Sequence, residues 1–340
     1  MEKNLKISII GGGSWGTTLS AMLAEKGYII KLWVRSRTTY NEIKKYRKNK
    51  KYTSNLKLPV NIKPFLNKKE ALKNTDLIIF AVPSHVLRSI IKLFYDELLY
   101  NCNKIKAIIN VAKGFETVTN LRLSQVMQQC VPEDLKSKIV ILSGPNISLE
   151  VANKLPSVTV ISSLNVKLLD YLQPIISTDY FRVYTNRDII GVEVSGAVKN
   201  IIAIASGISD SLGYGANTKA SLITRGLYEL SKFGTILGAN PQTFAGAAGM
   251  GDLVATCISK NSRNREVGER LGKGEKINKI LSSMFMIAEG VKTTKAVYEI
   301  AKIKNIDVPI TNCVYKIIYN NLDPVKSVNI LMSRKFKSEV

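Results

Sequence analysis

Residues 6–23 read KISIIGGGSWGTTLSAML and combine a β-favouring apolar run, a glycine-rich turn and the start of a helix. Gly11, Gly13 and Gly16 follow the order G-x-G-x-x-G. The first glycine allows a tight turn, the second lets the backbone approach a pyrophosphate, and the third lets the helix pack against the strand. A glycine-rich turn without a ligand is the plain alternative, but the flanking strand and helix favour a dinucleotide site at the helix N-terminus.

The next β-favouring run, residues 29–34, ends directly before Arg35. Sites that prefer NAD place an acid about 20 residues beyond the glycines, where it binds the ribose 2′-hydroxyl. Arg35 stands there instead, with Arg37 nearby, and a guanidinium can bind a 2′-phosphate and stack on adenine. We therefore expect NADP to be accepted as well as NAD. A solvent-facing arginine after a strand is the alternative.

Short apolar runs continue to alternate with helical stretches up to about residue 188. The expected further strands are 76–83, 104–111, 139–142, 156–162 and 180–184, and the polar segment 44–51 indicates a helix or a loop. This alternation predicts the α/β class, with an N-terminal Rossmann-like, doubly wound and mostly parallel sheet. Such sheets bind ligands beyond the carboxyl ends of their strands, where Arg35, Pro83, Lys113 and Gly144 stand.

From residue 189 onward the apolar spacing indicates helices and no strands. The expected helices are 192–207, 220–233, 263–271, 293–302 and 311–319. The sequence therefore predicts a dinucleotide-binding domain over residues 1–188 and an all-helical substrate-binding and catalytic domain over residues 189–340. The cleft between the two domains is the expected active site.

Lys199 is the candidate acid–base group. It lies within VEVSGAVKNIIAIASG, residues 192–207, beside Asn200. Burial among the surrounding small and apolar residues would lower its pKa and make it an acid–base at neutral pH. The alternative is a lysine that reaches solvent on its aliphatic stem. Asp252 lies in AAGMGDL, residues 247–253, which we expect to be a flexible glycine-rich loop. Asp252 could orient a lysine or a substrate hydroxyl, and the alternative is an aspartate of a turn.

The segment SRNR, residues 262–265, directly precedes an expected helix. A hydroxyl, a guanidinium and an amide at a helix N-terminus would bind a phosphate group, although a capping serine followed by exposed arginines is the alternative. His85 is the only histidine of the chain and has no evident partner in the sequence. Proton transfer therefore falls more naturally to lysine.

Composition narrows the classes of protein. The net charge is +23, but residues 44–52 (KKYRKNKKY) are the single dense basic cluster and no nucleic-acid-binding motif accompanies it. We therefore expect anionic small ligands and no nucleic-acid partner. The sequence has no run of eighteen apolar residues and no signal-peptide pattern, which favours a cytoplasmic protein without membrane insertion. The four scattered cysteines fit free thiols and show no metal-binding spacing.

Between residue 5 and about residue 320 the chain resembles bacterial NAD(P)-dependent glycerol-3-phosphate dehydrogenases. The resemblance rests on motifs in a specific order: GGGSWGTTLS (11–20), LWVR (32–35), AVPSH (81–85), AKGFE (112–116), SGPN (143–146), SGAVKNIIAIASGISDSLGYGANTKA (195–220), AGMGDL (248–253), SRNR (262–265) and AEGVKT (288–293). Many dehydrogenases share the glycine turn, whereas very few share the remaining motifs in this order.

The resemblance implies interconversion of sn-glycerol 3-phosphate and dihydroxyacetone phosphate by hydride transfer, supplying glycerol 3-phosphate for phospholipid synthesis, and it leaves a homodimer open. It implies that Lys199, as proton acceptor or donor, Lys113 and Asp252 form the catalytic set. The cofactor residues that it implies, besides the three glycines, are Ser14, Trp15, Arg35, Lys113, Ser148, Arg263, Ile287 and Glu289. The substrate residues that it implies are Lys113, Gly144, Asn146, Lys199, Asp252, Ser262, Arg263 and Asn264.

The chain departs from the family pattern at three positions: Asn146 replaces Ser or Thr, Ser148 replaces a common Ala, and Ser211 replaces Gly. Two other functions compete. A hydroxyacid or ketoacid reductase of similar build would bind a carboxylate, and segments 248–253 and 262–265 argue against it. A non-catalytic cationic binding protein is supported by the net charge alone.

Overall fold

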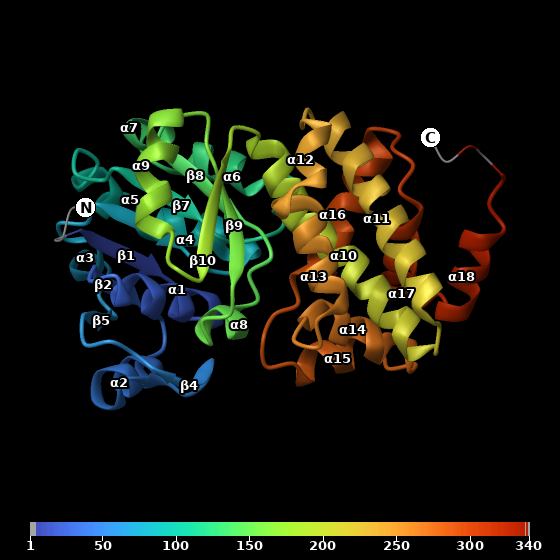
Figure 1. The fold of residues 1–340 in the computed structure, drawn as a ribbon, viewed down its shortest axis with the longest axis horizontal. Helices are drawn as coiled ribbons and strands as arrows, with labels where there is room; N and C mark the ends of the chain where they lie inside the picture. Colours follow the sequence, from blue (N-terminus) through green and yellow to red (C-terminus); the bar gives the residue numbers. More distant parts are fainter. Residues whose placement is uncertain (1–4, 337, 339–340) are drawn as a thin grey trace.

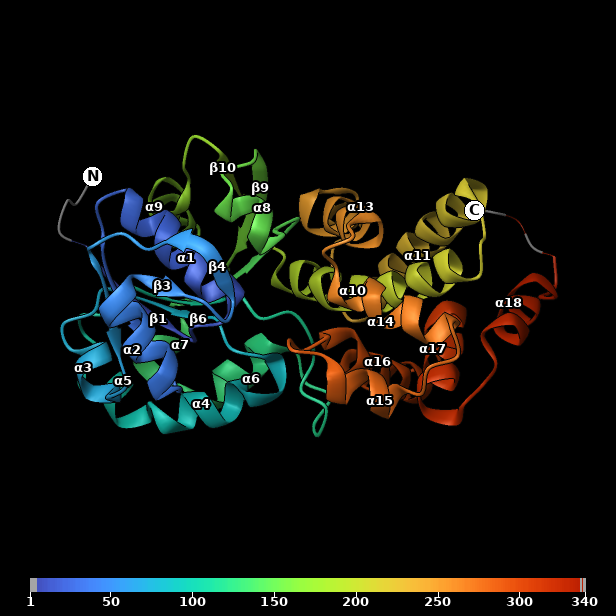
Figure 2. The same cartoon turned by 90° about the horizontal axis from the view of Figure 1, so that it is seen from below.

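A computed structural model of the protein describes residues 5–336 and 338. A sheet with helices on both faces forms the N-terminal part, and a group of helices forms the C-terminal part (Figures 1 and 2). The sheet has eight strands in the order β10-β9-β8-β7-β6-β1-β2-β5. The predicted fold class, a Rossmann-like sheet followed by a helical domain, is confirmed.

The strands of this sheet are β1 (Lys6–Ile10), β2 (Ile29–Trp33), β5 (Ile62–Phe65), β6 (Leu77–Phe80), β7 (Ala107–Asn110), β8 (Ile139–Ser143), β9 (Ser157–Ser162) and β10 (Phe181–Asn186). Neighbours pair in parallel except β8 and β9, which are antiparallel. Because helices cover both faces, the central strands are apolar at nearly every position. In β6, Leu77 and Ile79 join one buried cluster while Ile78 and Phe80 join the other.

The connecting helices of this part are α1 (Ser14–Glu25), α2 (Arg37–Tyr46), α3 (Lys68–Leu72), η1 (Ser84–Val86), α4 (Leu87–Leu93), α5 (Tyr95–Tyr100), α6 (Leu123–Cys130), α7 (Glu133–Lys136), α8 (Ser148–Ala152) and α9 (Val166–Ile176). The predicted strand, glycine turn and helix of residues 6–23 are β1, the turn and α1.

The basic segment 44–51 is only partly the helix or loop that the sequence predicts. Helix α2 ends at Tyr46, and the chain then forms an antiparallel hairpin of β3 (Lys48–Asn49) and β4 (Thr53–Lys57). A tertiary contact stabilises this hairpin, because the buried Asn49 side-chain amide donates to the carbonyl oxygen of Gly12 over 2.9 Å. The apolar pattern also does not predict strand β5, because Lys63 and Pro64 interrupt it. Proline is tolerated in β5 because it is an edge strand.

The helical domain contains α10 (Ile189–Ser211), α11 (Ala216–Ile236), α12 (Pro241–Ala245), η2 (Ala247–Gly251), α13 (Asp252–Ile258), α14 (Arg263–Gly272), α15 (Ile277–Ser283), α16 (Glu289–Ile303), α17 (Pro309–Asn320) and α18 (Pro324–Met332). Helix α10 is central and packs against α11, α13, α14 and α16. Glycines let α10 and α14 approach closely, since a Cβ on Gly207 would lie 2.0 Å from the carbonyl oxygen of Arg265.

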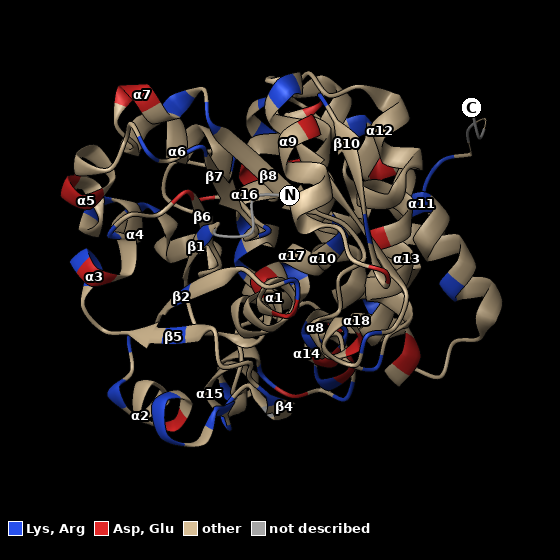
Figure 3. Cartoon of the chain, turned by 60° about the vertical axis from the view of Figure 1, so that its left-hand side comes forward, with Lys and Arg blue, Asp and Glu red and all other residues tan. Residues whose placement is uncertain are grey.

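Helix α10 is also, among the described residues, the one helix whose length and composition would suit a membrane span. Of its most apolar window, 83% is buried inside the protein. Its apolar surface is therefore covered by its neighbours, as in the core helix of a globular domain. Figure 3 shows basic residues on α2 and on several other elements in that view.

Candidate active site

The glycine turn between β1 and α1 has the shape that a dinucleotide needs. Gly11 has a φ of +119°, and a Cβ there would lie 2.4 Å from the carbonyl oxygen of Ala81. A Cβ on Gly16 would lie 2.0 Å from the carbonyl oxygen of Gly11. At Gly13, by contrast, a Cβ would meet nothing within 4 Å. The turn is thus filled on the protein side and open at Gly13, beside the first N–H groups of α1, so these residues fit a pyrophosphate.

Other predicted cofactor residues surround this turn. The Ser14 hydroxyl lies 2.7 Å from the hydroxyl of Ser148, which begins α8. The ring of Trp15 lies 6.2 Å from the ring of Phe181 on β10. Arg35 lies two residues beyond the end of β2 and is exposed, so it is accessible to a ligand bound at this edge.

Three charged side chains meet where the sheet faces the helical domain. Lys199, on α10, donates a hydrogen bond to Asp252 Oδ1, and Lys113, just beyond β7, donates to Asp252 Oδ2 over 2.6 Å. Lys113 also donates to the carbonyl oxygen of Gly144 over 2.8 Å. Lys199 and Asp252 are 6% and 1% exposed, so the carboxylate and this lysine are almost fully buried. The predicted catalytic residues therefore lie together.

The environment of Lys199 suits this side chain to proton transfer. Burial is the main cause that lowers its pKa, the Asp252 carboxylate opposes it, and the positive charge of Lys113 adds to it; together they bring the pKa of Lys199 to about 7. A lysine that titrates near neutrality can accept a proton as the neutral amine and donate one as the ammonium. Thr256 lies one helical turn beyond Asp252 and is the second partner of Lys199, with its Oγ1 2.7 Å from Nζ.

The segment 247–253 is helical, which corrects the predicted flexible loop. Residues Ala247–Gly251 form one π-helical turn that continues directly into α13, whose first residue is Asp252. The glycines serve close packing: a Cβ on Gly249 would lie 2.2 Å from the carbonyl oxygen of Phe244. A rigid helical start holds Asp252 between the two lysines better than a loop would.

The predicted phosphate segment lies at the start of α14. Ser262 caps this helix, its hydroxyl accepting from the Arg265 N–H over 3.3 Å. Arg263 is exposed and donates to the carbonyl oxygen of Ile287 over 2.8 Å. Asn264 Oδ1 accepts from the Gly290 N–H over 2.9 Å. The predicted substrate residues of α14 thus contact the segment that carries the predicted cofactor residues Ile287 and Glu289.

Gly144 and Asn146 lie just beyond β8. Gly144 has a φ of +150°, and a Cβ there would lie 3.0 Å from Thr159 Cα, so a larger residue would be strained. The Asn146 amide donates to the Val158 carbonyl oxygen over 2.9 Å and accepts from the Thr159 hydroxyl over 3.0 Å. Gly144 therefore joins the cluster through Lys113, while the Asn146 side chain is turned towards β9.

Sequence reasoning missed three residues of this region. Thr256 could have been found by its spacing of four from Asp252 on one helix face. Asn49 supports the glycine turn, and Ser84 binds Glu289; neither contact has a sequence signal, since each joins residues that are far apart in the chain. His85, which follows Ser84, lies outside the lysine–aspartate cluster. Burial, and to a lesser extent Lys292, lowers its pKa.

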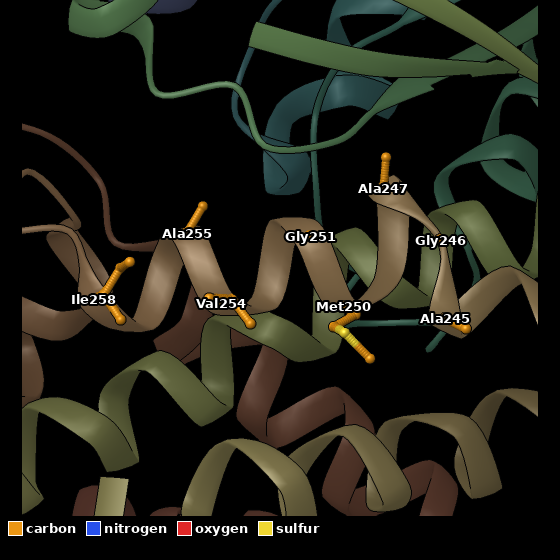
Figure 4. A pocket seen from close by; sticks show the side chains of 8 residues that line it. All are labelled: Ala245, Gly246, Ala247, Met250, Gly251, Val254, Ala255 and Ile258. Carbon is orange, nitrogen blue, oxygen red and sulfur yellow. The ribbon is translucent and has the colours of Figure 1, made fainter. Parts of the chain in front are cut away.

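A shallow pocket lies along η2 and α13. Its lining consists of Ala, Gly, Met, Val and Ile only: Ala245, Gly246, Ala247, Met250, Gly251, Val254, Ala255 and Ile258 (Figure 4). Such a lining supplies no acid–base chemistry. Among the described residues no group of three or more His, Cys, Asp and Glu side chains could hold a metal ion.

Comparison with known proteins gives consistent matches. The family model described as NAD-dependent glycerol-3-phosphate dehydrogenase N-terminus matches residues 6–169, and the corresponding C-terminus model matches residues 188–329. A curated relative from Clostridium botulinum (strain Eklund 17B / Type B), named as an NAD(P)+ glycerol-3-phosphate dehydrogenase, is 45% identical over 335 residues. The alignment covers 98% of this chain and 99% of the relative.

A relative of the same name from Chlorobium limicola is 42% identical and covers 99% of this chain and 100% of its own. The crystal structure of glycerol-3-phosphate dehydrogenase from Coxiella burnetii has a TM-score of 0.89 at 34% identity, covering 98% of this chain and 100% of that one. A ketopantoate reductase from Ralstonia eutropha shares only the fold, with a TM-score of 0.55 at 15% identity.

Proposed function

The chain belongs to the NAD-dependent glycerol-3-phosphate dehydrogenase family, and on this basis we propose that it interconverts sn-glycerol 3-phosphate and dihydroxyacetone phosphate with NAD(H) or NADP(H). The observation that carries this proposal is the buried cluster of Lys199, Asp252 and Lys113. It joins the helical domain to the carboxyl edge of the sheet, where ligands of such folds bind.

The cofactor, when bound, supplies or accepts a hydride at its nicotinamide ring. Gly11, Gly13 and Gly16 would hold its pyrophosphate at the start of α1. The remaining proposed cofactor residues are Ser14, Trp15, Arg35, Lys113, Ser148, Arg263, Ile287 and Glu289. Because Arg35 is exposed at the end of β2, where an acid would repel a phosphate, we propose that NADP is accepted as well as NAD.

Lys199 exchanges the proton in this mechanism. When the substrate alcohol is oxidised, neutral Lys199 accepts the hydroxyl proton; when the ketone is reduced, protonated Lys199 returns it. Asp252 fixes the position of Nζ, and Thr256 supplies a second fixed partner. Lys113 is 18% exposed in its side chain and can therefore stabilise negative charge on the reacting oxygen.

The substrate phosphate would bind at the N-terminus of α14. Arg263 supplies an exposed guanidinium, Ser262 lies at the cap, and Asn264 is fixed between Asn200 and Gly290. Helix N-terminal N–H groups and a guanidinium together favour a dianion. Gly144 and Asn146 complete the proposed substrate set on the sheet side. Binding the phosphate remotely would position the reacting carbon near Lys199.

We also propose the division into a cofactor domain, residues 1–188, and a catalytic domain, residues 189–340. The hydrophobic clusters support it. One gathers residues of the helical domain, with Phe115 from the sheet domain. The two others fill the faces of the sheet, and one of these also takes in Val192 and Ala248 of the helical domain. We further propose that the protein is cytoplasmic, that it supplies glycerol 3-phosphate for phospholipid synthesis, and that it forms a homodimer.

The test is oxidation of NADPH and NADH by the purified protein with dihydroxyacetone phosphate, followed by absorbance. We expect rapid oxidation with this substrate and none with pyruvate or ketopantoate. Oxidation with ketopantoate alone would instead support a reductase of the same fold, and folded protein without oxidation of either cofactor would contradict a dehydrogenase.

The Lys199→Ala variant tests the proton carrier. We expect turnover to fall by about two to four decades while cofactor binding survives, because the proton then has no positioned acceptor. Lys302→Ala is the matched control, since Lys302 is exposed on α16. Turnover of Lys199→Ala within a few-fold of the wild type would show that another group carries the proton.

A further inference from the structure

The carboxylate of Glu289, in the helical domain, accepts two hydrogen bonds from one residue of the sheet domain, Ser84. The Ser84 N–H donates to Glu289 Oε1 over 3.0 Å, and the Ser84 hydroxyl donates to Glu289 Oε2 over 2.5 Å. Ser84 is 3% exposed and Glu289 is half-buried. Hydrogen bonds to an ionised acceptor are shorter and stronger than neutral ones, so this pair is a firm contact.

Ser84 belongs to the loop after β6, whose first residues contact the glycine turn. It begins η1, three residues after Ala81, whose N–H donates to the Ile10 carbonyl oxygen over 2.9 Å. On its other side it contacts the loop of the predicted catalytic lysine. A Cβ on Gly114, the residue after Lys113, would lie 2.9 Å from the Ser84 hydroxyl oxygen. Ser84 therefore lies on the loop that follows β6, directly beside the loop that carries Lys113.

Glu289 belongs to a segment that the helical domain holds from the other side. Arg263 donates to the Ile287 carbonyl oxygen over 2.8 Å, and Asn264 accepts from the Gly290 N–H over 2.9 Å. The segment 287–290 thus has contacts to the start of α14 and, through Glu289, to the sheet. Glu289 is also the first residue of α16, and the helix dipole favours a negative charge at this end of the helix.

We propose that Ser84 is a positioning residue, which holds the Glu289 carboxylate and so keeps segment 287–290 against the cofactor-binding edge of the sheet. The inference rests on the proposed function, in which Ile287 and Glu289 contact the cofactor. Ser84 acts through Glu289 and does not itself contact the reacting atoms. In a variant that lacks the Ser84 hydroxyl, Glu289 keeps only its bond to the Ser84 N–H, so segment 287–290 is held less firmly against the sheet.

The Ser84→Ala variant tests this proposal by NADPH fluorescence titration without substrate. We expect the Kd for NADPH to rise about tenfold, from loss of one charge-assisted bond, and the KM for NADPH to rise with it. The KM for dihydroxyacetone phosphate should stay within about twofold. The control is Ser89→Ala, since exposed Ser89 donates only to the Val86 carbonyl oxygen in the same segment; its Kd should equal that of the wild type.

Glu289→Asp provides the second arm, since the shorter side chain keeps the charge but withdraws it from Ser84. In this background, adding Ser84→Ala should change the Kd by less than about twofold, because Ser84 would have lost the group through which it acts. An unchanged Kd in Ser84→Ala, or effects of the two substitutions that multiply, would overturn the inference. Wild-type protein that binds no NADPH would instead overturn the proposed function.

Discussion

Removing either charge beside Lys199 should shift its titration in a direction that the structure defines. Burial lowers the pKa of Lys199, Asp252 raises it and Lys113 lowers it, and together the three effects bring it from 10.5 to about 7. Asp252→Asn removes the opposing carboxylate and leaves Lys113 unneutralised, so the pKa should fall below 7. Lys113→Met removes the repelling ammonium and leaves Asp252 to Lys199 alone, so the pKa should rise.

The magnitude follows from the distances and the burial. Both ammonium groups are within hydrogen-bonding distance of Asp252, and a charge at such range shifts a pKa by about 1 to 3 units. We expect about one unit in each variant. With a pKa of about 7, about half of the Lys199 groups are neutral at pH 7, whereas at 10.5 only about one in 3,000 would be. The low pKa thus makes neutral Lys199, the form that the proposed mechanism needs as proton acceptor, available at neutral pH.

The assay is kcat/KM against pH in both directions, which reports ionisations of the free enzyme and free substrate. Oxidation of glycerol 3-phosphate needs neutral Lys199, so its kcat/KM should rise with pH up to about 7 and then level. Reduction of dihydroxyacetone phosphate needs the ammonium, so its kcat/KM should fall above about 7. The substrate phosphate also titrates near pH 6, but identically in every variant, so the shifts between variants isolate Lys199.

The amplitude of kcat/KM will fall in both variants, since each removes a residue of the site, and only the position of the inflexion is diagnostic. Inflexions that move in the same direction in Asp252→Asn and Lys113→Met would refute the electrostatic account. So would a wild-type profile with its inflexion near 10, because Lys199 would then titrate as an ordinary lysine.

Three further substitutions test other parts of the site. Arg263→Ala should raise the KM for glycerol 3-phosphate at least about tenfold and the KM for the cofactor much less; an unchanged substrate KM would remove Arg263 from the phosphate site. Arg35→Asp should move the ratio of kcat/KM values from NADP towards NAD, and a constant ratio would place the 2′-phosphate elsewhere. Gly16→Ala should lower the melting temperature, because its Cβ would lie 2.0 Å from the Gly11 carbonyl oxygen; an unaltered melting temperature would contradict that packing.

What the sequence could predict depends on the range of the interaction. The turn at Gly11, Gly13 and Gly16 is a local device in which each glycine has its own steric reason, and the structure has the strand and helix where the pattern predicts them. Apolar spacing likewise identifies α10, because a long run of buried residues needs no distant partner to be visible. The sequence pattern fails at residues 48–57, where the contact between Asn49 and Gly12 stabilises a hairpin in a polar segment.

The same distinction applies to the site. That Lys199 lies in an apolar helix is visible in the sequence, but its neutral-range pKa also depends on Lys113, 86 positions away, which only the fold brings near. For segment 247–253 the sequence prediction is wrong, because its glycines suggest a flexible loop. The structure shows instead that Gly249 is needed for close packing against Phe244.

The two errors have one physical origin. Glycine and polar residues are permissive, so their local conformation is set by whatever packs against them, and that partner is not visible nearby in the sequence. Asp252, Lys113 and Ser84 all follow or begin short elements at the junction of the two domains, and each is fixed by a contact across that junction. A site assembled in this way gains its rigidity from the fold as a whole. Its chemistry can therefore be inferred from residue types, whereas its geometry comes from the packing of the two domains.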